Sequence, residues 1–261
     1  MAAGAAESRN YFAQLVALLR HSAVQLVRAP SHSQRAEAAR RLARHALLLT
    51  VILGACVISL MIGLDAREIA LMPARGTPNL WPVRIFTDFG NDAYVLWMLA
   101  AALIVIGLAS PLLQETARAR LLRFGTQMQY LFFAVLVPVL FAEVVKWVAG
   151  RGRPFVGGKA NPFNFVPFTG TEAYFSFPSA HAVTGFALAV AIGAVWPRAQ
   201  PWMLVYALLI AASRLVLLAH HPSDVVAGAL IGVLGAMAVR YWFAARQLGF
   251  AIRGDGKIVP L

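Results

Sequence analysis

The chain has 261 residues, of which 60% are hydrophobic and only 13% carry a charge, and its mean hydropathy is +0.69. This composition is typical of a membrane protein and excludes an ordinary soluble domain. The formal net charge is +12, but no basic stripe is interleaved with aromatic residues, so we expect arginines beside anionic lipid headgroups rather than a nucleic-acid partner.

Residues 1–44 mix polar and apolar residues and are expected to form a cytoplasmic N-terminal segment. Phe12, Leu15, Val16 and Leu19 recur at helical spacing, which predicts an amphipathic helix lying on the inner membrane surface. A frayed cytoplasmic tail is the alternative. A cleaved signal peptide is not expected, because the first long apolar run starts only near Ala46 and no processing site follows it.

Continuous apolar segments follow, each about long enough to cross a ~30 Å hydrocarbon core as a helix. They are Ala46–Leu64, Ala93–Ala109, Gln127–Ala149, Ala180–Trp196, Trp202–Ala219 and Val225–Ala245. The fourth and fifth are near the lower limit, so five spans with one re-entrant segment are the alternative. The sequence therefore predicts an all-α polytopic protein, with a six-helix transmembrane domain at 45–247 and a cytoplasmic tail at 248–261.

The distribution of lysine and arginine predicts the orientation. With a cytoplasmic N-terminus and six crossings, 15 of the 23 basic residues lie inside. The other eight lie outside: Arg67, Arg75, Arg84, Lys146, Arg151, Arg153, Lys159 and Arg214. Three of these eight belong to the motifs described next, so the positive-inside rule favours this orientation.

The first motif lies where the third apolar segment ends. Lys146 is expected to be helical still, and Gly150, Gly152 and Pro154 are expected to break the helix so that Arg153 turns back toward Lys146. Cations at such a place often only extend to the membrane interface. We assign that interfacial role, at the rim, to Arg151.

The second motif, Pro178-Ser179-Ala180-His181, opens the fourth segment. A serine before a helix is commonly just a cap. A helix N-terminus also presents free N–H groups and a partial positive charge to an anion, so Ser179 and Ala180 are predicted to contact a bound anion. His181, in the first turn, is predicted to be catalytic.

The third motif runs from Ser213-Arg214 to His220 and Asp224. An arginine inside an apolar segment must be paired or face a wet cavity. If the last helix begins near Pro222, Asp224 lies in its first turn, where it is expected to accept a hydrogen bond from Nδ1 of His220. Nε2 of His220 is then free to attack.

Two alternatives are open at this third motif. His221 is the rival nucleophile. A zinc site built from His181, His220, His221 and Asp224 is the rival chemistry, and it is disfavoured because the nearby cations would repel a divalent metal. The number of crossings between the motifs places all three at the outer face, where Lys146, Arg153 and Arg214 suit a phosphate.

These three stretches resemble the type 2 phosphatidic acid phosphatases (PAP2), the integral-membrane branch of the superfamily shared with vanadium haloperoxidases. The family pattern is Lys-x6-Arg-Pro, then Pro-Ser-Gly-His, then Ser-Arg-x5-His-x3-Asp. The first and third patterns are matched in full. The second departs at Ala180, where glycine is usual, and a positive φ at this position would strain an alanine.

The resemblance implies a two-step, metal-independent phosphatase that needs no cofactor. Lys146, Arg153, Arg214 and the chain at Ser179–His181 would hold the phosphoryl group. His220 would attack phosphorus, His181 would act as acid and base, and Asp224 would orient His220.

The expected substrate is a lipid phosphate at the outer leaflet of a bacterial inner membrane, with the site facing the periplasm. Phosphatidic acid, phosphatidylglycerol phosphate, undecaprenyl pyrophosphate and lipid A phosphates are candidates. The alternatives are a lipid phosphotransferase that uses the same histidine, and a non-catalytic lipid-phosphate carrier. The carrier is disfavoured because binding alone needs neither His220 nor His181.

Overall fold

The computed structural model describes residues 11–154, 156–157 and 160–261. Lys159, counted above among the outer cations, and residues 1–10 of the N-terminal segment lie outside this range. The long helices are α1 (Tyr11–Val27), α2 (Arg35–Gly63), α5 (Asp92–Ala109), α6 (Glu115–Ala149), α7 (Ala180–Val195), α8 (Gln200–Val216) and α9 (Pro222–Ala245). The short elements are α3 (Asp65–Leu71), α4 (Trp81–Thr87), five 3₁₀ turns (Pro78–Leu80, Asp88–Gly90, Ser110–Leu112, Glu172–Tyr174 and Pro197–Ala199), β1 (Phe250–Ile252) and β2 (Ile258–Pro260).

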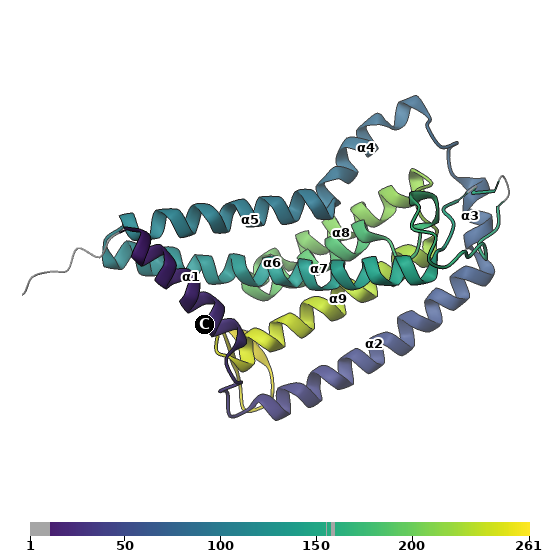
Figure 1. Ribbon diagram of the computed structural model, residues 1–261. Helices are drawn as coiled ribbons and strands as arrows, with labels where there is room; N and C mark the ends of the chain where they lie inside the picture. Colours follow the sequence, from purple (N-terminus) through teal and green to yellow (C-terminus); the bar gives the residue numbers. More distant parts are fainter. Residues whose placement is uncertain (1–10, 155, 158–159) are drawn as a thin grey trace, which may run out of the picture.

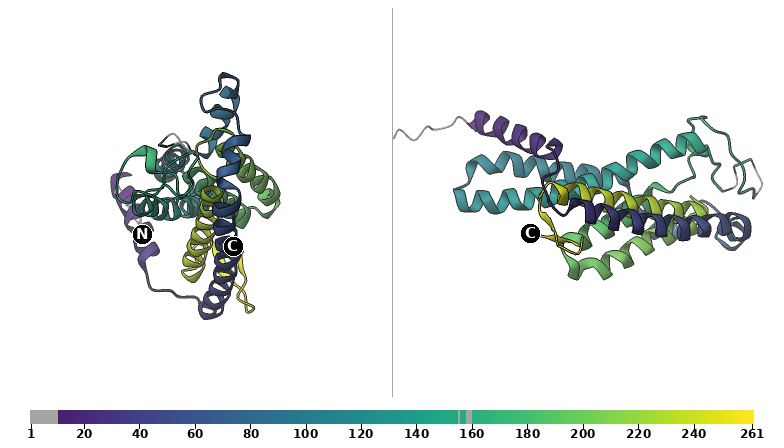
Figure 2. Two further views of the ribbon diagram at one scale, coloured as in Figure 1. Left: turned by 90° about the vertical axis from the view of Figure 1, so that its right-hand side faces the viewer. Right: turned by 90° about the horizontal axis from the view of Figure 1, so that it is seen from below.

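The long helices form an elongated bundle with α7 at its centre (Figures 1 and 2). α7 packs against α6, α8 and α9, whereas α5 packs on α6 and α2 lies along α9. Glycines allow α9 to approach α7 closely. A Cβ at Gly232 would lie 2.3 Å from the carbonyl oxygen of Val183, and one at Gly228 would lie 2.5 Å from that of Ser179. The second contact brings α9 directly against the start of α7.

Five segments of the described chain are long and apolar enough to cross a membrane: Arg35–Gly63, Asp92–Leu112, Glu115–Ala149, Pro197–Val216 and Pro222–Ala245. α7 is shorter, with 16 residues, or about 24 Å at 1.5 Å per residue. Most of its side chains are buried by its neighbours. The predicted polytopic helical architecture is confirmed, with the predicted fourth span as the short central helix.

Several boundaries differ from the expected ones. The border at residues 44 and 45 falls inside α2, and α6 begins at Glu115 rather than near Gln127. The outer segment between the first two spans contains the helices α3 and α4. The tail at 248–261 forms an antiparallel hairpin in which Ala251 pairs with Val259, so the helical fold carries two short strands.

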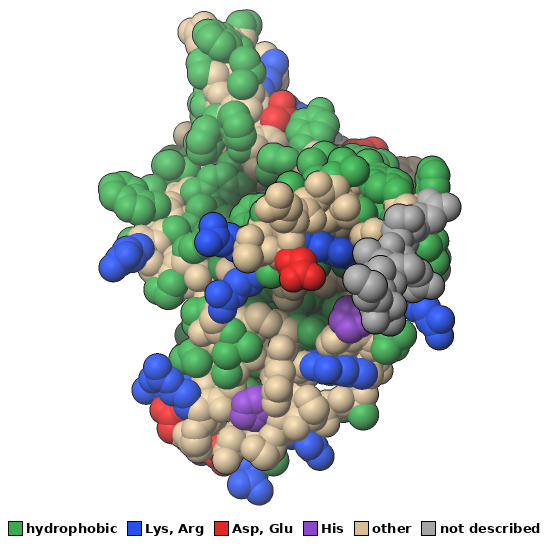
Figure 3. Space-filling model, turned by 90° about the vertical axis from the view of Figure 1, so that its left-hand side faces the viewer, with side chains coloured by type: hydrophobic (Ala, Val, Ile, Leu, Met, Phe, Trp, Pro, Cys, Tyr) green, Lys and Arg blue, Asp and Glu red, His purple; other side chains and the backbone are tan. Residues whose placement is uncertain are grey.

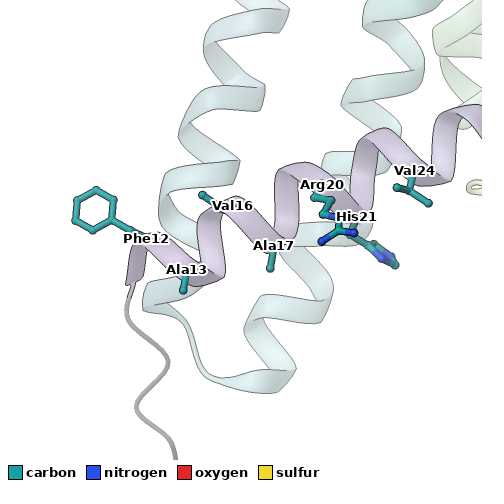
Figure 4. Close-up of a pocket in the computed structure, with 7 residues that line it drawn as sticks. All are labelled: Phe12, Ala13, Val16, Ala17, Arg20, His21 and Val24. Carbon is teal, nitrogen blue, oxygen red and sulfur yellow. The ribbon is translucent and has the colours of Figure 1, made fainter.

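α1 crosses the end of the bundle that also holds the C-terminus (Figure 1). The Tyr11 hydroxyl donates to the carbonyl oxygen of Leu108 (2.9 Å), and Nε1 of Trp242 donates to that of Leu26 (3.1 Å). One face of α1 remains exposed and lines an open surface pocket, where Phe12, Val16 and Val24 lie beside Arg20 and His21 (Figure 4). The predicted helix is therefore present, and its apolar side chains lie on the outside of the bundle.

Candidate active site

The three motifs meet at the opposite end of the bundle from the C-terminus (Figure 1). α6 ends at Ala149, and Gly150 caps it in the left-handed conformation with φ 55°. A Cβ at Gly150 would lie 2.0 Å from the carbonyl oxygen of Val166, so only glycine fits where the chain turns away. The helix break predicted after Lys146 is confirmed.

Lys146, Arg153 and Arg214 lie close together around the histidines. Lys146 and Arg214 are each only 8% exposed. The charges of all three cations act on the rings of both His220 and His181. The structure therefore brings together the cations and imidazoles that the sequence grouped.

Each of these cations has one protein partner that leaves donors free. Lys146 pairs with Glu143 one turn earlier on α6. Arg153 Nη2 donates to the exposed carboxylate of Glu172 (3.2 Å).

Arg214 Nη1 donates to the hydroxyl of Thr87 (2.9 Å), which also accepts from Ser213 Oγ at 2.9 Å. Thr87, at the end of α4, is a contact that the sequence did not indicate.

Three buried donors of the described site have no hydrogen-bond partner: Arg153 Nε, Arg214 Nε and Ser179 Oγ. An unsatisfied buried polar group costs about 1–3 kcal/mol. All three belong to residues of the predicted phosphate site, and an anion bound there would satisfy them.

The start of α7 supplies backbone donors. Ser179 is the N-cap residue of α7, although its side chain makes no cap hydrogen bond, and its backbone N–H donates to the carbonyl oxygen of Asp224 (3.0 Å). The N–H groups of Ala180 and His181 follow in the first turn, where helical acceptors are lacking. Ala180 is helical and does not have a positive φ, so alanine in place of the family glycine causes no backbone strain.

His220 is buried in the short connection between α8 and α9, with 3% exposure. Its Nδ1 lies 2.7 Å from the carbonyl oxygen of Ser176. Because a carbonyl only accepts, Nδ1 carries the proton and Nε2 carries the lone pair. Burial and then the charge of Arg214 lower the pKa of His220 well below its ordinary value, so the ring is neutral at physiological pH.

The predicted hydrogen bond between His220 and Asp224 is wrong. Oδ2 of Asp224 lies 4.0 Å from Nδ1 of His220 and accepts instead from the Ser176 hydroxyl (2.6 Å) and the His221 backbone N–H (2.8 Å). The chain between the two residues is not one continuous helix, so the four-residue spacing does not bring the side chains into contact. Ser176 bridges them, because its carbonyl binds His220 and its hydroxyl binds Asp224.

The predicted interfacial position of Arg151 is also wrong. Arg151 is fully buried, with Nη2 2.8 Å from Oδ2 of Asp65 and Nη1 in contact with Oδ1 of Asp224. Two further bonds reach the carbonyl oxygen of Pro162. This pairing was not predictable, since Asp65, the first residue of α3, lies 86 residues before Arg151 along the chain.

His221 is the N-cap residue of α9, and its side chain is 1% exposed. His221 therefore has a structural position, whereas the ring of His220 is oriented by Ser176 and lies beside the three cations. Among the described residues, no group of three or more His, Cys, Asp or Glu side chains is arranged to hold a metal ion.

Comparison with known proteins agrees with this geometry. Residues 127–248, which contain all three motifs, match the PAP2 superfamily. The lipid A 1-phosphatase of Rhizobium johnstonii is 33% identical over 174 residues, covering 66% of this chain and 71% of the relative. The decaprenylphosphoryl-5-phosphoribose phosphatase of Mycolicibacterium smegmatis is 33% identical, and the match covers 64% of this chain and 81% of the relative. The bacitracin transport permease protein BcrC of Bacillus licheniformis is 29% identical, and the match covers 70% of this chain and 91% of the relative. No solved structure matches the chain.

A helical membrane bundle with three clustered cations and a neutral, oriented histidine at one end defines a membrane-embedded phosphatase. The chain belongs to the PAP2 superfamily.

Proposed function

We propose that the protein hydrolyses a phosphomonoester or pyrophosphate group of a membrane lipid through a phosphohistidine intermediate. The main support is the set of buried, unpartnered donors on Arg153, Ser179 and Arg214 beside the imidazole of His220. A phosphoryl group placed among them would satisfy these donors and lie against the nucleophile.

In the first step, Nε2 of His220 attacks phosphorus and the bond to the lipid oxygen breaks. His181 gives a proton to that oxygen as the lipid leaves. Lys146, Arg153 and Arg214 offset the negative charge on the phosphoryl oxygens. In the second step, His181 takes a proton from water, which attacks phosphorus and breaks the P–N bond. Free phosphate leaves and His220 returns to its neutral form.

Phosphorylation of Nε2 turns the ring of His220 into a cation. The carbonyl of Ser176, which accepts from Nδ1, and the carboxylate of Asp224 at 4.0 Å both stabilise that charge. Asp224 therefore acts by electrostatics across Ser176 rather than by a direct hydrogen bond, in a role related to the aspartate of a serine-protease triad.

The preferred substrate class is a phosphorylated glycolipid of the lipid A type, which the Rhizobium relative's name specifies. A polyprenyl-linked phosphate is the second candidate, on the similarity to the decaprenylphosphoryl-5-phosphoribose phosphatase. Both have long apolar chains that match a site at the end of a membrane bundle.

We further propose that the site faces the periplasm of a bacterial inner membrane. The opposite end, with α1 and the C-terminus, displays many Lys and Arg side chains and few acidic ones (Figure 3). Basic residues concentrate on the cytoplasmic side of membrane proteins. The exposed apolar face of α1 is consistent with a helix lying in the inner headgroup layer.

The test is phosphate release by purified protein in detergent from lipid A, phosphatidic acid, phosphatidylglycerol phosphate and undecaprenyl pyrophosphate. EDTA is present throughout, and His220→Ala is the matched blank. Activity on lipid A above the other lipids supports the proposal, whereas activity that EDTA abolishes and zinc or magnesium restores contradicts the mechanism. A lipid acceptor added to the same assay detects phosphotransfer, and binding without release would identify a carrier.

A further inference from the structure

A second polar cluster adjoins the predicted catalytic residues and is isolated from water. Asp65, Arg151, Ser223 and Asp224 are each fully buried. They come from three separate places in the chain: the start of α3, the turn after α6, and the first turn of α9. Only Asp224 belongs to the motifs that define the site.

Arg151 is shared between two carboxylates in this cluster. Nη2 donates to Oδ2 of Asp65 (2.8 Å), and Nη1 donates to the Ser223 hydroxyl (2.7 Å) and to Oδ1 of Asp224. The Ser223 hydroxyl in turn donates to Asp65, whose Oδ1 accepts from the Ser223 backbone N–H at 3.1 Å. The fork geometry of a guanidinium allows this double contact, which an ammonium does not reproduce.

The cluster connects to the nucleophile in two steps. Arg151 fixes Oδ1 of Asp224, while Oδ2 accepts from Ser176, whose carbonyl holds Nδ1 of His220. The backbone carbonyl of Arg151 also accepts from the Ser176 N–H (3.0 Å). Arg151 therefore holds both of the groups that stabilise the His220 ring, although it is not one of the three cations of the predicted phosphate site.

We propose that Arg151 and Asp65 are positioning residues for phosphoryl transfer to His220. Arg151 keeps the Asp224 carboxylate in place, and Asp65 anchors Arg151 from α3. This inference rests on the proposed role of His220. Under this proposal Asp65, which lies just after the first membrane-spanning helix, supports the chemistry. The helix itself, α2, has few buried side chains.

The split between kcat and KM distinguishes this role from a structural one. Loss of Arg151 should release the Asp224 carboxylate and, through it, Ser176, which slows phosphoryl transfer while the three cations stay in place. The charged and titratable groups around Asp224 are Asp65 and Glu68 from α3, Arg151 and Arg153 from the segment after α6, and His220 and His221 before α9. Of these, Arg151 alone is a cation in contact with the Asp224 carboxylate.

The experiment compares Asp65→Asn/Arg151→Met with wild type, using p-nitrophenyl phosphate so that the result does not depend on the lipid. The double substitution removes one positive and one negative charge, so the cluster keeps its net charge and the ion pair is replaced as a unit. We expect kcat to fall about 10- to 100-fold, the usual effect of losing a supporting contact. KM should stay unchanged. A wild-type kcat would overturn the proposal, because Arg151 would then serve only to neutralise Asp65.

Arg151→Lys gives a second measurement if the double variant does not fold. It keeps the buried charge but loses the fork geometry, so kcat should fall roughly 10-fold while KM stays unchanged. A wild-type kcat in this variant would refute the positioning role. Arg67→Met, an exposed arginine on the same helix as Asp65, is the matched control and should behave as wild type. If the protein acts on p-nitrophenyl phosphate but on no lipid, only the proposed lipid substrate is contradicted. If His220→Ala is active, the assignment of His220 as nucleophile and the positioning role of Arg151 are both overturned.

Discussion

Glu68 offers a test of the electrostatics behind the site, because it is a buried acid without a hydrogen-bond partner in the described structure. The side chain is 4% exposed, and neither carboxylate oxygen is hydrogen-bonded. Burial, followed by the charges of Asp65 and Asp224, raises the pKa of Glu68 from 4.5 to about 7. The ionised form is therefore disfavoured in the folded protein.

The effect on stability follows from proton binding. Below pH 4.5 the acid is protonated in both the folded and unfolded states. Between 4.5 and about 7 the unfolded chain loses the proton while the folded protein keeps it, so the free energy of unfolding falls as pH rises. Above that range the full cost remains, about 3 kcal/mol at ~1.4 kcal/mol per pH unit.

Glu68→Gln removes this cost. We expect the variant to unfold at a temperature roughly 5–10 °C higher than wild type at about pH 8.5, and at nearly the same temperature at about pH 5. Thermal unfolding in detergent, monitored by tryptophan fluorescence, measures the unfolding temperature at each pH. Glu115→Gln, at an exposed acid, is the control and should change neither temperature. An equal gain at both pH values, or no gain at the higher one, would refute the reasoning.

Three further predictions concern the catalytic end and its orientation. His220→Ala should abolish turnover while His221→Ala keeps most of it; loss of activity only in His221→Ala would show that the wrong imidazole was assigned. Arg214→Lys should lower the rate of lipid dephosphorylation by about 30- to 1,000-fold, or roughly 2–4 kcal/mol, because an ammonium cannot reproduce the planar fork in a desolvated site. The control Arg84→Lys, at an exposed arginine, should cost little, and equal losses would mean that Arg214 does not contact the phosphate. Cysteines placed at Thr169 and Gln200 in a Cys56→Ala background should label from opposite sides of intact cells, with position 169 outside. Labelling of position 169 only after lysis would reverse the orientation.

The positions of the helices were largely predictable, because each span is a continuous apolar run. The ends of the helices were less predictable. Arg118, Arg120 and Arg123 lower the hydropathy before the third span, yet arginine is a good helix former and α6 continues through them. The final hairpin was missed because it contains only three residues in each strand.

The motif residues were predictable because their spacing puts them at one end of the bundle. The contacts that support these residues were not predictable. Ser176 lies in an irregular loop without a recognisable pattern, and it meets His220 only after the chain has folded back. Arg151 looked like an interfacial cation because its partner Asp65 is separated from it by two membrane-spanning helices.

The most direct test of the central claim is to trap the intermediate. Protein mixed with substrate and quenched rapidly with base should carry a phosphoryl group on the peptide that contains His220, because phosphohistidine survives alkali. Mass spectrometry would locate the group, and His220→Ala would serve as the blank. We predict phosphate on His220 in the wild-type enzyme during turnover. Phosphate on another residue, or turnover without any covalent phosphate, would contradict the mechanism.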